Sequence, residues 1–378
     1  MRIRLSKRAL LAVAVVGATG PLATAALGAN ASSKSFNWST AKSVKAGGGM
    51  NALVKAAKKE GTLNVIALPT NWANYGAQLN TFHKKYGIKI HSDNPSGTSA
   101  QEIEAIKNGK GRSSAPDVVD VGLPFAAAGK SQGFFAPYKV ATWMSIPKNQ
   151  KSSDGSYYQD YGGFISFGCN MNLLGSTPCP TSWAALKQSK YKNDVALNGS
   201  PLSANAALSA VWAAGVNSGG SAKNIKPGVD FFHQLRSSGN YNATDCNAAS
   251  IIATSCPITI NWDYLNTAGA WGLTGATHWK VVDPKGIPFG GFYAQAVSKY
   301  APHPAAARLW EEFLYSAKGQ NIWLKGGARP VTLAAMIAAG TANKTALKAL
   351  PKVTNISKAV IPTTAQANAA AAYVAQNW

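Results

Sequence analysis

Acidic residues are scarce in this sequence, which has 15 aspartates and glutamates against 37 lysines and arginines in 378 residues. A net charge of +22 often accompanies nucleic-acid binding, but nucleic-acid-binding proteins gather their basic residues into a patch or stripe. Here the basic residues stand as singles and pairs, such as Lys58-Lys59 and Lys84-Lys85. We therefore expect no nucleic-acid partner, and instead a solvated basic surface that faces an anionic cell envelope or an acidic habitat.

Catalytic and metal-binding signatures are also missing. The five histidines show no H-E-x-x-H or other metal-ligand spacing, and no G-x-S-x-G nucleophile motif occurs. We expect a protein that is not an enzyme and that uses no metal and no cofactor. The alternative is a secreted hydrolase acting on a cell-envelope or sugar substrate, because a glycosidase needs only two facing carboxylates, which this chain can supply without a motif that marks them.

Cysteine is absent from the first 168 residues, which excludes a lipid anchor of the lipoprotein type. Four basic residues among the first eight precede an apolar stretch at 9–16, which Gly20 and Pro21 interrupt before small residues lead to Ala31. This order is typical of a cleaved export signal. A retained membrane anchor is the alternative, but a span needs about 20 uninterrupted apolar residues. We predict a signal peptide at 1–31 and a periplasmic or extracellular mature protein.

The four cysteines that do occur form two local pairs, and neither pair has the C-x-x-C spacing of a redox or metal site. In an oxidising compartment such cysteines form disulfides. We predict bonds between Cys169 and Cys179 and between Cys246 and Cys256, because each would close a short loop that contains a proline. Other pairings stay open on the sequence alone.

Strand and helix patterns alternate along most of the chain, which predicts an α/β fold whose sheets are mostly parallel and flanked by helices. Residues 32–49, rich in Ser, Lys and Gly, precede this pattern and are predicted to be a flexible lead-in. Two α/β units are expected. Ser200-Pro201 looks like the start of a helix in the second unit, with an N-cap hydroxyl followed by proline. The predicted strands are 62–68, 88–91 and 117–121 in the first unit and 163–167, 195–197 and 258–260 in the second.

Several short segments, in this order, resemble the extracellular solute-binding proteins of ABC importers. They include Pro180-Thr181-Ser182-Trp183 with Lys190-Tyr191-Lys192, and the helix-like segment 304–320 that ends in Lys-Gly-Gln; the order of the set is more specific than any single piece. The resemblance runs from about residue 50 to 331. It is to the type II periplasmic binding protein group, which takes up polyamines, ferric iron, phosphonates and sugar phosphates.

This resemblance implies a monomeric, two-lobed protein that traps a small-molecule ligand between its lobes and delivers it to a membrane permease. By analogy, the first lobe would comprise 50–165 and a return at 283–378 that includes C-terminal helices. The second lobe would be 166–282, with crossings near 163–170 and 281–295. The expected solute is a polyamine-like amine or an aminophosphonate or phosphate ester.

The first group of candidate ligand contacts follows predicted strands of the first lobe. Asn71, Trp72 and Tyr75 offer an amide and aromatic faces after the first strand. Residues Ser96, Thr98 and Ser99 lie directly before a helix, where free backbone N–H groups suit an anionic or carbonyl oxygen. Hydroxyls at this place also fit a purely structural role as helix caps.

The second group lies near the crossing back to the first lobe. Trp262 and Asp263 follow a predicted strand, and an acid beside aromatic rings suits an amine. Asp263 is notable because carboxylates are few, although a turn or helix cap is an alternative role. Tyr293 stands at the predicted return. A zwitterion would satisfy both groups of candidates.

Overall fold

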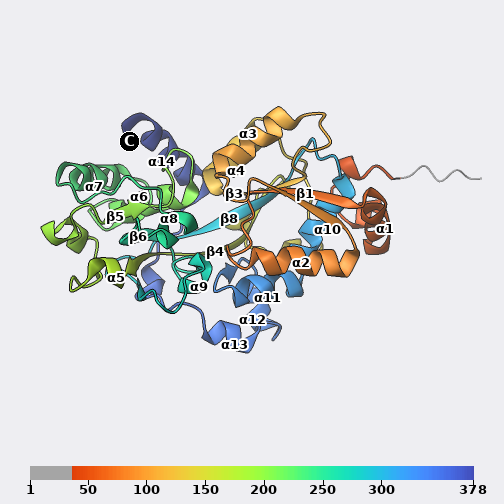
Figure 1. Ribbon diagram of the computed structural model, residues 1–378. Helices are drawn as coiled ribbons and strands as arrows, with labels where there is room; N and C mark the ends of the chain where they lie inside the picture. Colours follow the sequence, from red (N-terminus) through yellow and green to blue (C-terminus); the bar gives the residue numbers. More distant parts are fainter. Residues whose placement is uncertain (1–35) are drawn as a thin grey trace, which may run out of the picture. The chain divides into compact units, whose positions relative to one another are not determined.

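Two long strands organise the sheet of this protein, for which a computed structural model describes residues 36–378 (Figure 1). They are β4 (Tyr158–Asn170) and β8 (Gly290–Val297), and the strand order is β3-β8-β4-β6-β5. All thirteen residues of β4 are buried. Glycines permit this crowding, because a Cβ at Gly162 or Gly163 would collide with neighbouring β8 or with Asp263. The predicted signal peptide lies outside the described residues.

The strand pairing is mixed, which corrects the prediction of mostly parallel sheets. Parallel pairs join β1 (Thr62–Ile66) to β2 (Lys89–Asp93) and β5 (Val195–Leu197) to β6 (Ile258–Trp262). By contrast, β4 and β8 run antiparallel to each other, β8 to β3 (Val118–Gly122), and β4 to β6. The alternation of strands and helices along the chain indicates how consecutive strands pair. It does not indicate that the long strands β4 and β8 lie between strands that are distant in the sequence.

We call the group containing β1–β3 and helices α1–α4 the first lobe. Two of its helices end at glycines that adopt the left-handed conformation: Gly61 closes α1 with φ of +75° and Gly87 closes α2 with φ of +71°. Helix α3 lies on one side of β1 and β3, and α2 and α10 lie on the other (Figure 1). The helices are α1 (Met50–Glu60), α2 (Tyr75–Tyr86), α3 (Ser99–Gly109) and α4 (Leu123–Ser131).

We call the group containing β5, β6 and helices α6–α8 the second lobe. Helix α6 (Asn205–Val216) is buried along its whole length, whereas the others are partly exposed: α7 (Lys226–Ser237) and α8 (Ala248–Ile252). The predicted helix start at Ser200-Pro201 is wrong, since a turn occupies 201–203 and α6 begins at Asn205. Both predicted disulfides are confirmed, each with Cα atoms 5.9 Å apart.

The remaining chain returns to the first lobe and then covers both lobes. Helix α14 (Thr364–Asn377) packs against α4 of the first lobe and against α6 and α7 of the second. The indole of Trp378 lies 5.6 Å from the Phe232 ring and 4.0 Å from the Arg236 guanidinium, both on α7. The other elements are α5 (Met171–Leu174), α9 (Ala268–Trp271), β7 (Trp279–Val282), α10 (Pro304–Leu314), α11 (Ala317–Lys325), β9 (Arg329–Pro330), α12 (Leu333–Ala338) and α13 (Lys344–Lys348).

Part of the segment predicted to be a flexible lead-in contacts the rest of the fold. Trp38 is 6% exposed, and Gly47 leaves no room for a side chain beside its ring. The buried guanidinium of Arg308 on α10 donates to the carbonyls of Ser39 and Ala41, at 2.9 and 3.0 Å. The low complexity of the segment gave no sign of these contacts, because they need only one tryptophan and the backbone carbonyls of two residues. Within residues 36–378, no helix has the length and apolarity needed to cross a bilayer.

Replacing Trp38 with alanine is expected to lower the free energy of unfolding by about 3 kcal/mol, because it removes a large buried side chain and leaves a cavity. Urea denaturation of the purified protein measures this change. Lys45→Ala, in the same segment but exposed, is the matched control and is expected to change stability by less than about 0.5 kcal/mol. Equal stability of the two variants would restore the picture of a flexible lead-in.

Candidate functional site

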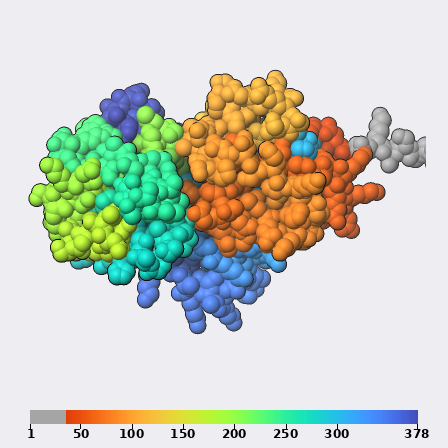
Figure 2. Space-filling view, viewed as in Figure 1, coloured from red at the N-terminus to blue at the C-terminus, as the bar shows by residue number. Residues whose placement is uncertain are grey.

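A cavity of about 160 Å³ lies between residues of the two lobes. Loops that follow β1 and β2 line it from the first lobe, the loops around Asn198 and Asp245 line it from the second, and Tyr293 of β8 forms part of its wall. In Figure 2, the teal residues near α8 and α9 meet the orange residues of the first lobe along a continuous seam. The carboxyl end of β1 opens onto this cavity, where ligands of α/β proteins commonly bind.

Direct hydrogen bonds connect the lobes at the rim of the cavity. The Asn71 side-chain amide donates to the carbonyl of Ala270 at 2.5 Å, and the Ala100 N–H donates to the carbonyl of Ser203 at 3.3 Å. Gly122 approaches the Asn205 side chain so closely that a Cβ atom would overlap it. The described arrangement is therefore one in which the two walls touch.

Two helix N-termini lie at the cavity. Helix α3 begins with a capping box, in which Thr98 and Gln101 satisfy each other's backbone N–H groups. Helix α6 differs, because its N-cap is Ala204, which has no side chain that accepts a hydrogen bond. Asn205 and Ala206, the first residues of α6, line the cavity, so their N–H groups offer partial positive charge to a ligand.

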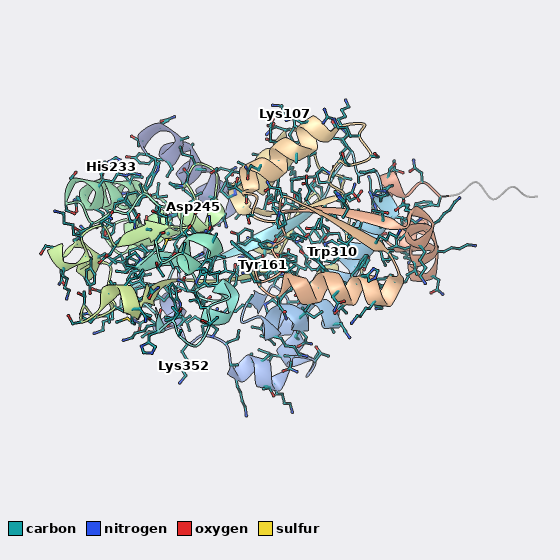
Figure 3. The ribbon with its side chains drawn as sticks, viewed as in Figure 1. Lys107, Tyr161, His233, Asp245, Trp310 and Lys352 are labelled. Carbon is teal, nitrogen blue, oxygen red and sulfur yellow. A yellow bond between two sulfur atoms is a disulfide. The ribbon has the colours of Figure 1, made fainter. Side chains whose placement is uncertain are left out.

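Three carboxylic acids line the same cavity: Glu102 on α3, Asp120 on β3 and Asp245 of the second lobe. No lysine or arginine is among the lining residues in the described chain. Asp245 is exposed and accepts a hydrogen bond from the Gly199 N–H at 2.7 Å. Figure 3 labels Asp245 beside the second-lobe strands and Tyr161 on β4. The cavity wall is thus acidic in a protein whose surface is basic.

Asp120 and Glu102 are both buried, with side chains 5% and 2% exposed. The Oε2 atom of Glu102 accepts from the Asp120 N–H at 2.8 Å. Burial raises the pKa of Asp120 to about 7, although hydroxyl donors from Tyr75 and Tyr161 oppose the shift. Burial and the neighbouring Asp120 raise the pKa of Glu102 well above its ordinary value. The change between the neutral and charged forms of Asp120 therefore falls near neutral pH.

Two buried polar atoms of the cavity wall lack a partner within the described residues. They are the Oδ1 atom of Asp120, an acceptor, and the Nε1–H group of Trp271, a donor. Buried polar atoms are normally hydrogen-bonded, and leaving one unpaired costs about 1–3 kcal/mol. A ligand that carries both a donor and an acceptor group would satisfy the two atoms.

Six of the nine predicted ligand residues line the cavity: Asn71, Trp72, Ser96, Thr98, Ser99 and Tyr293. The ring of Trp72 packs edge-on against that of Tyr293, with centroids 5.9 Å apart. The Oγ atom of Ser99 accepts from the Gly122 N–H at 3.0 Å, so this hydroxyl joins α3 to β3. Tyr75 is not a lining residue, but its hydroxyl donates to Asp120 at 2.6 Å.

Trp262 and Asp263 lie outside this cavity. Trp262 is fully buried with its ring 6.4 Å from that of Tyr293. Asp263 pairs with Arg329 at 2.7 Å and accepts from the Phe164 and Tyr264 N–H groups. The carboxylate expected to bind an amine therefore has a cation from its own chain, contributed by a segment 66 residues away, which sequence proximity could not reveal.

Asp263→Asn is expected to lower the free energy of unfolding by about 3 kcal/mol, because it leaves the largely buried Arg329 charge without its partner. Chemical denaturation measures this loss. In a double-mutant cycle, Arg329→Met is expected to cost less in the Asp263→Asn background than in the wild type. Additive costs would contradict the ion pair, and an unchanged stability with lost solute binding would return Asp263 to the site.

Sequence reasoning missed Asp120, Glu102, Asp245 and Trp271. One signal was present: Asp120 interrupts the apolar run Val118-Val119-Asp120-Val121, and an acid inside a buried strand marks a special environment. The three others carried no such signal, because they come together only through the loops of two lobes. Among residues 36–378, no cluster of three or more His, Cys, Asp or Glu side chains has an arrangement that could hold a metal ion.

Comparison with known proteins gives a family and a fold. The family model described as bacterial extracellular solute-binding protein matches residues 113–355, more than half of the chain. No curated protein matches the sequence.

Among solved structures, the periplasmic binding protein AfuA from Actinobacillus pleuropneumoniae, with fructose-6-phosphate bound, has a TM-score of 0.63 and 17% identity over 83% of this chain and 96% of its own. AgtB from A. tumefaciens R10, in complex with agropinic acid, has a TM-score of 0.64 and 15% identity over 84% and 97%. The Atu4243 GABA receptor has a TM-score of 0.58 and 19% identity over 83% and 94%. At these identities the likeness shows the two-lobed fold.

Proposed function

The chain belongs to the bacterial extracellular solute-binding protein family, and we propose that it captures a small zwitterionic, amine-bearing solute for an ABC importer. The lobes hold the solute in the cavity between them and release it to a membrane permease. The protein acts outside the cytoplasm, exported by the signal peptide at 1–31. Members of this family bind solutes, and the proposal includes no catalytic step.

The charge of the cavity wall carries the proposal. Three carboxylic acids and no lysine or arginine line it, so an ammonium group has partners there and a multiply charged anion has none. The uncapped N-terminus of α6 and the Trp271 N–H group supply donors for one singly charged oxygen group, such as a carboxylate. A zwitterion places one group at each end.

This reading narrows the solute classes expected from the sequence. A phosphate ester would bring two negative charges beside Asp120 and Asp245, with no lysine or arginine among the described lining residues, at a large desolvation cost. Aminophosphonates share part of this penalty. γ-Aminobutyrate, the solute in the name of one structural relative, has the proposed distribution of charge.

The proposed contacts are spread over both lobes. Trp72 and Tyr293 provide aromatic faces for the ammonium group or its adjoining carbon atoms. The hydroxyl of Ser96 and the amide of Asn71, both on exposed loops, lie at the rim, and Thr98 and Ser99 mainly fix the start of α3. Trp262 supports the Tyr293 ring from behind.

A thermal-shift panel tests the solute class. Two amines are expected to raise the melting temperature: the zwitterion γ-aminobutyrate and the diamine putrescine, which is a dication. A solute at a hundred times its Kd stabilises the folded state by about 2.7 kcal/mol. Fructose 6-phosphate at equal concentration is expected to leave it unchanged. Stabilisation by the phosphate ester alone would contradict the proposal, and hydrolysis of a panel compound would favour the alternative of a secreted hydrolase.

Gly122→Ala tests whether contact between the walls is needed for capture. The added methyl group meets the Asn205 side chain where β3 approaches α6, so we expect about a tenfold loss of solute affinity, equal to about 1.4 kcal/mol. Isothermal titration calorimetry measures the affinity. Gly275→Ala, where the methyl group would enter open space, is the control and is expected to bind normally. Equal solute affinities of the Gly122→Ala and Gly275→Ala variants would show that solute binding does not require the close contact between Gly122 and Asn205.

A further inference from the structure

We propose that the ammonium group of the solute binds the Oδ1 atom of Asp120, and that Asp120 gives up a proton to the solvent when the solute enters. This inference rests on the proposed function, since it assigns one residue and one protonation step to the same cavity. It makes solute capture sensitive to pH, in the direction that weakens binding as the medium becomes acidic.

The position of Asp120 supports this assignment. It stands on β3, opposite Gln295 of β8, and it lines the cavity although it is 95% buried. Its Oδ2 atom accepts hydrogen bonds from the hydroxyls of Tyr75 and Tyr161, at 2.6 and 2.9 Å. Its Oδ1 atom has no partner among the described residues. One oxygen is therefore fixed by the fold, and the other remains for a ligand.

The surroundings of Asp120 contain acids and phenols from every packed element. Glu102 contributes from α3, Asp160 from β4 and Glu311 from α10, and each interacts electrostatically with Asp120. The phenols are Tyr75, Tyr161, Tyr264, Tyr293 and Tyr315. A hydrogen-bond chain links the acids, because the Gln295 amide donates to both Tyr75 and Asp160, at 2.9 and 3.0 Å. Among the described residues, none of the groups that shift the pKa of Asp120 is a cation that would offset its negative charge.

Without solute, burial favours the neutral form of Asp120, and its pKa of about 7 places the change of charge at physiological pH. An ammonium group supplies the missing cation, which favours the carboxylate. In the balanced step, a carboxylic acid and an ammonium ion give an ion pair and one proton, which leaves for the solvent. The O–H bond of Asp120 breaks, and no other covalent bond changes.

The sign of the pH effect follows from this balance. Below the pKa of Asp120, solute binding must release a proton, so the apparent affinity rises about tenfold per pH unit. Above that pKa the carboxylate is already formed and the affinity becomes constant. Burial also raises the pKa of Glu102 well above its ordinary value, so this neighbouring acid supplies no positive charge to Asp120.

Calorimetric titration of the full-length protein with γ-aminobutyrate and with putrescine, from pH 5 to 8, tests the proposal. Titration at pH 6 in two buffers with different ionisation enthalpies counts the protons released. We expect close to one proton released at pH 6 and none at pH 8, with an affinity that rises about tenfold per unit below pH 7. This proton count needs no variant, so it holds even if a substitution at Asp120 disturbs folding.

The variant Asp120→Asn tests whether the proton released on solute binding comes from Asp120. This variant is expected to bind 10- to about 100-fold more weakly at pH 8, as for loss of a hydrogen bond to a charged group, and to show no pH dependence. Asp245→Asn is the matched control, since it removes the exposed acid of the same cavity, and its affinity is expected to keep the wild-type slope with pH.

The outcomes separate this inference from the proposed function. Binding of the amines with no proton released, or with an unchanged slope in Asp120→Asn, overturns the role of Asp120 and leaves the amine-binding function standing. Failure of both amines at pH 8, while an uncharged or anionic solute of the panel binds, overturns both.

Discussion

The junction of β3, β4 and β8 holds Asp120 and Asp160 away from water, and their partners there are uncharged tyrosine hydroxyls and the Gln295 amide. Burying an acid in this way raises its pKa and makes its negative form costly. Gly162 and Gly163 let β4 approach its neighbours closely, which helps to exclude solvent from this junction. The proposed preference for an amine at Asp120 and the proposed response to pH both depend on this unfavourable burial.

Features that are local in the chain were predictable from the sequence. The glycines at 61 and 87 end helices because they accept positive φ, and the two cysteine pairs bond within their own loops. The motif at 304–320 becomes α10 and the start of α11. Each depends on a few neighbouring residues. The two-lobed fold followed from the order of such segments and from the resemblance they carry.

Features formed by distant residues were not predictable in the same way. Asp263 looks like a free acid in the sequence, yet Arg329 neutralises it. Ser200-Pro201 has the composition of a helix start, but the loop that lines the cavity continues to residue 204. A segment of low complexity is anchored by Trp38, which packs against Gly47, and by Arg308 of α10, which donates to the carbonyl of Ala41. In each case tertiary contacts override a local preference, and those contacts come from residues far along the chain.

Helix α14 adds a connection whose effect reaches the cavity from outside. It touches α4 on the first lobe and α6 and α7 on the second, and Trp378 clamps its end onto Phe232 and Arg236. If α4 and α7 move apart, α14 must therefore lose its contacts with one of them or shift with it. The energy needed to open the binding cavity is then set partly at the carboxyl terminus, so evolution can tune solute release there while every ligand-contacting side chain stays the same.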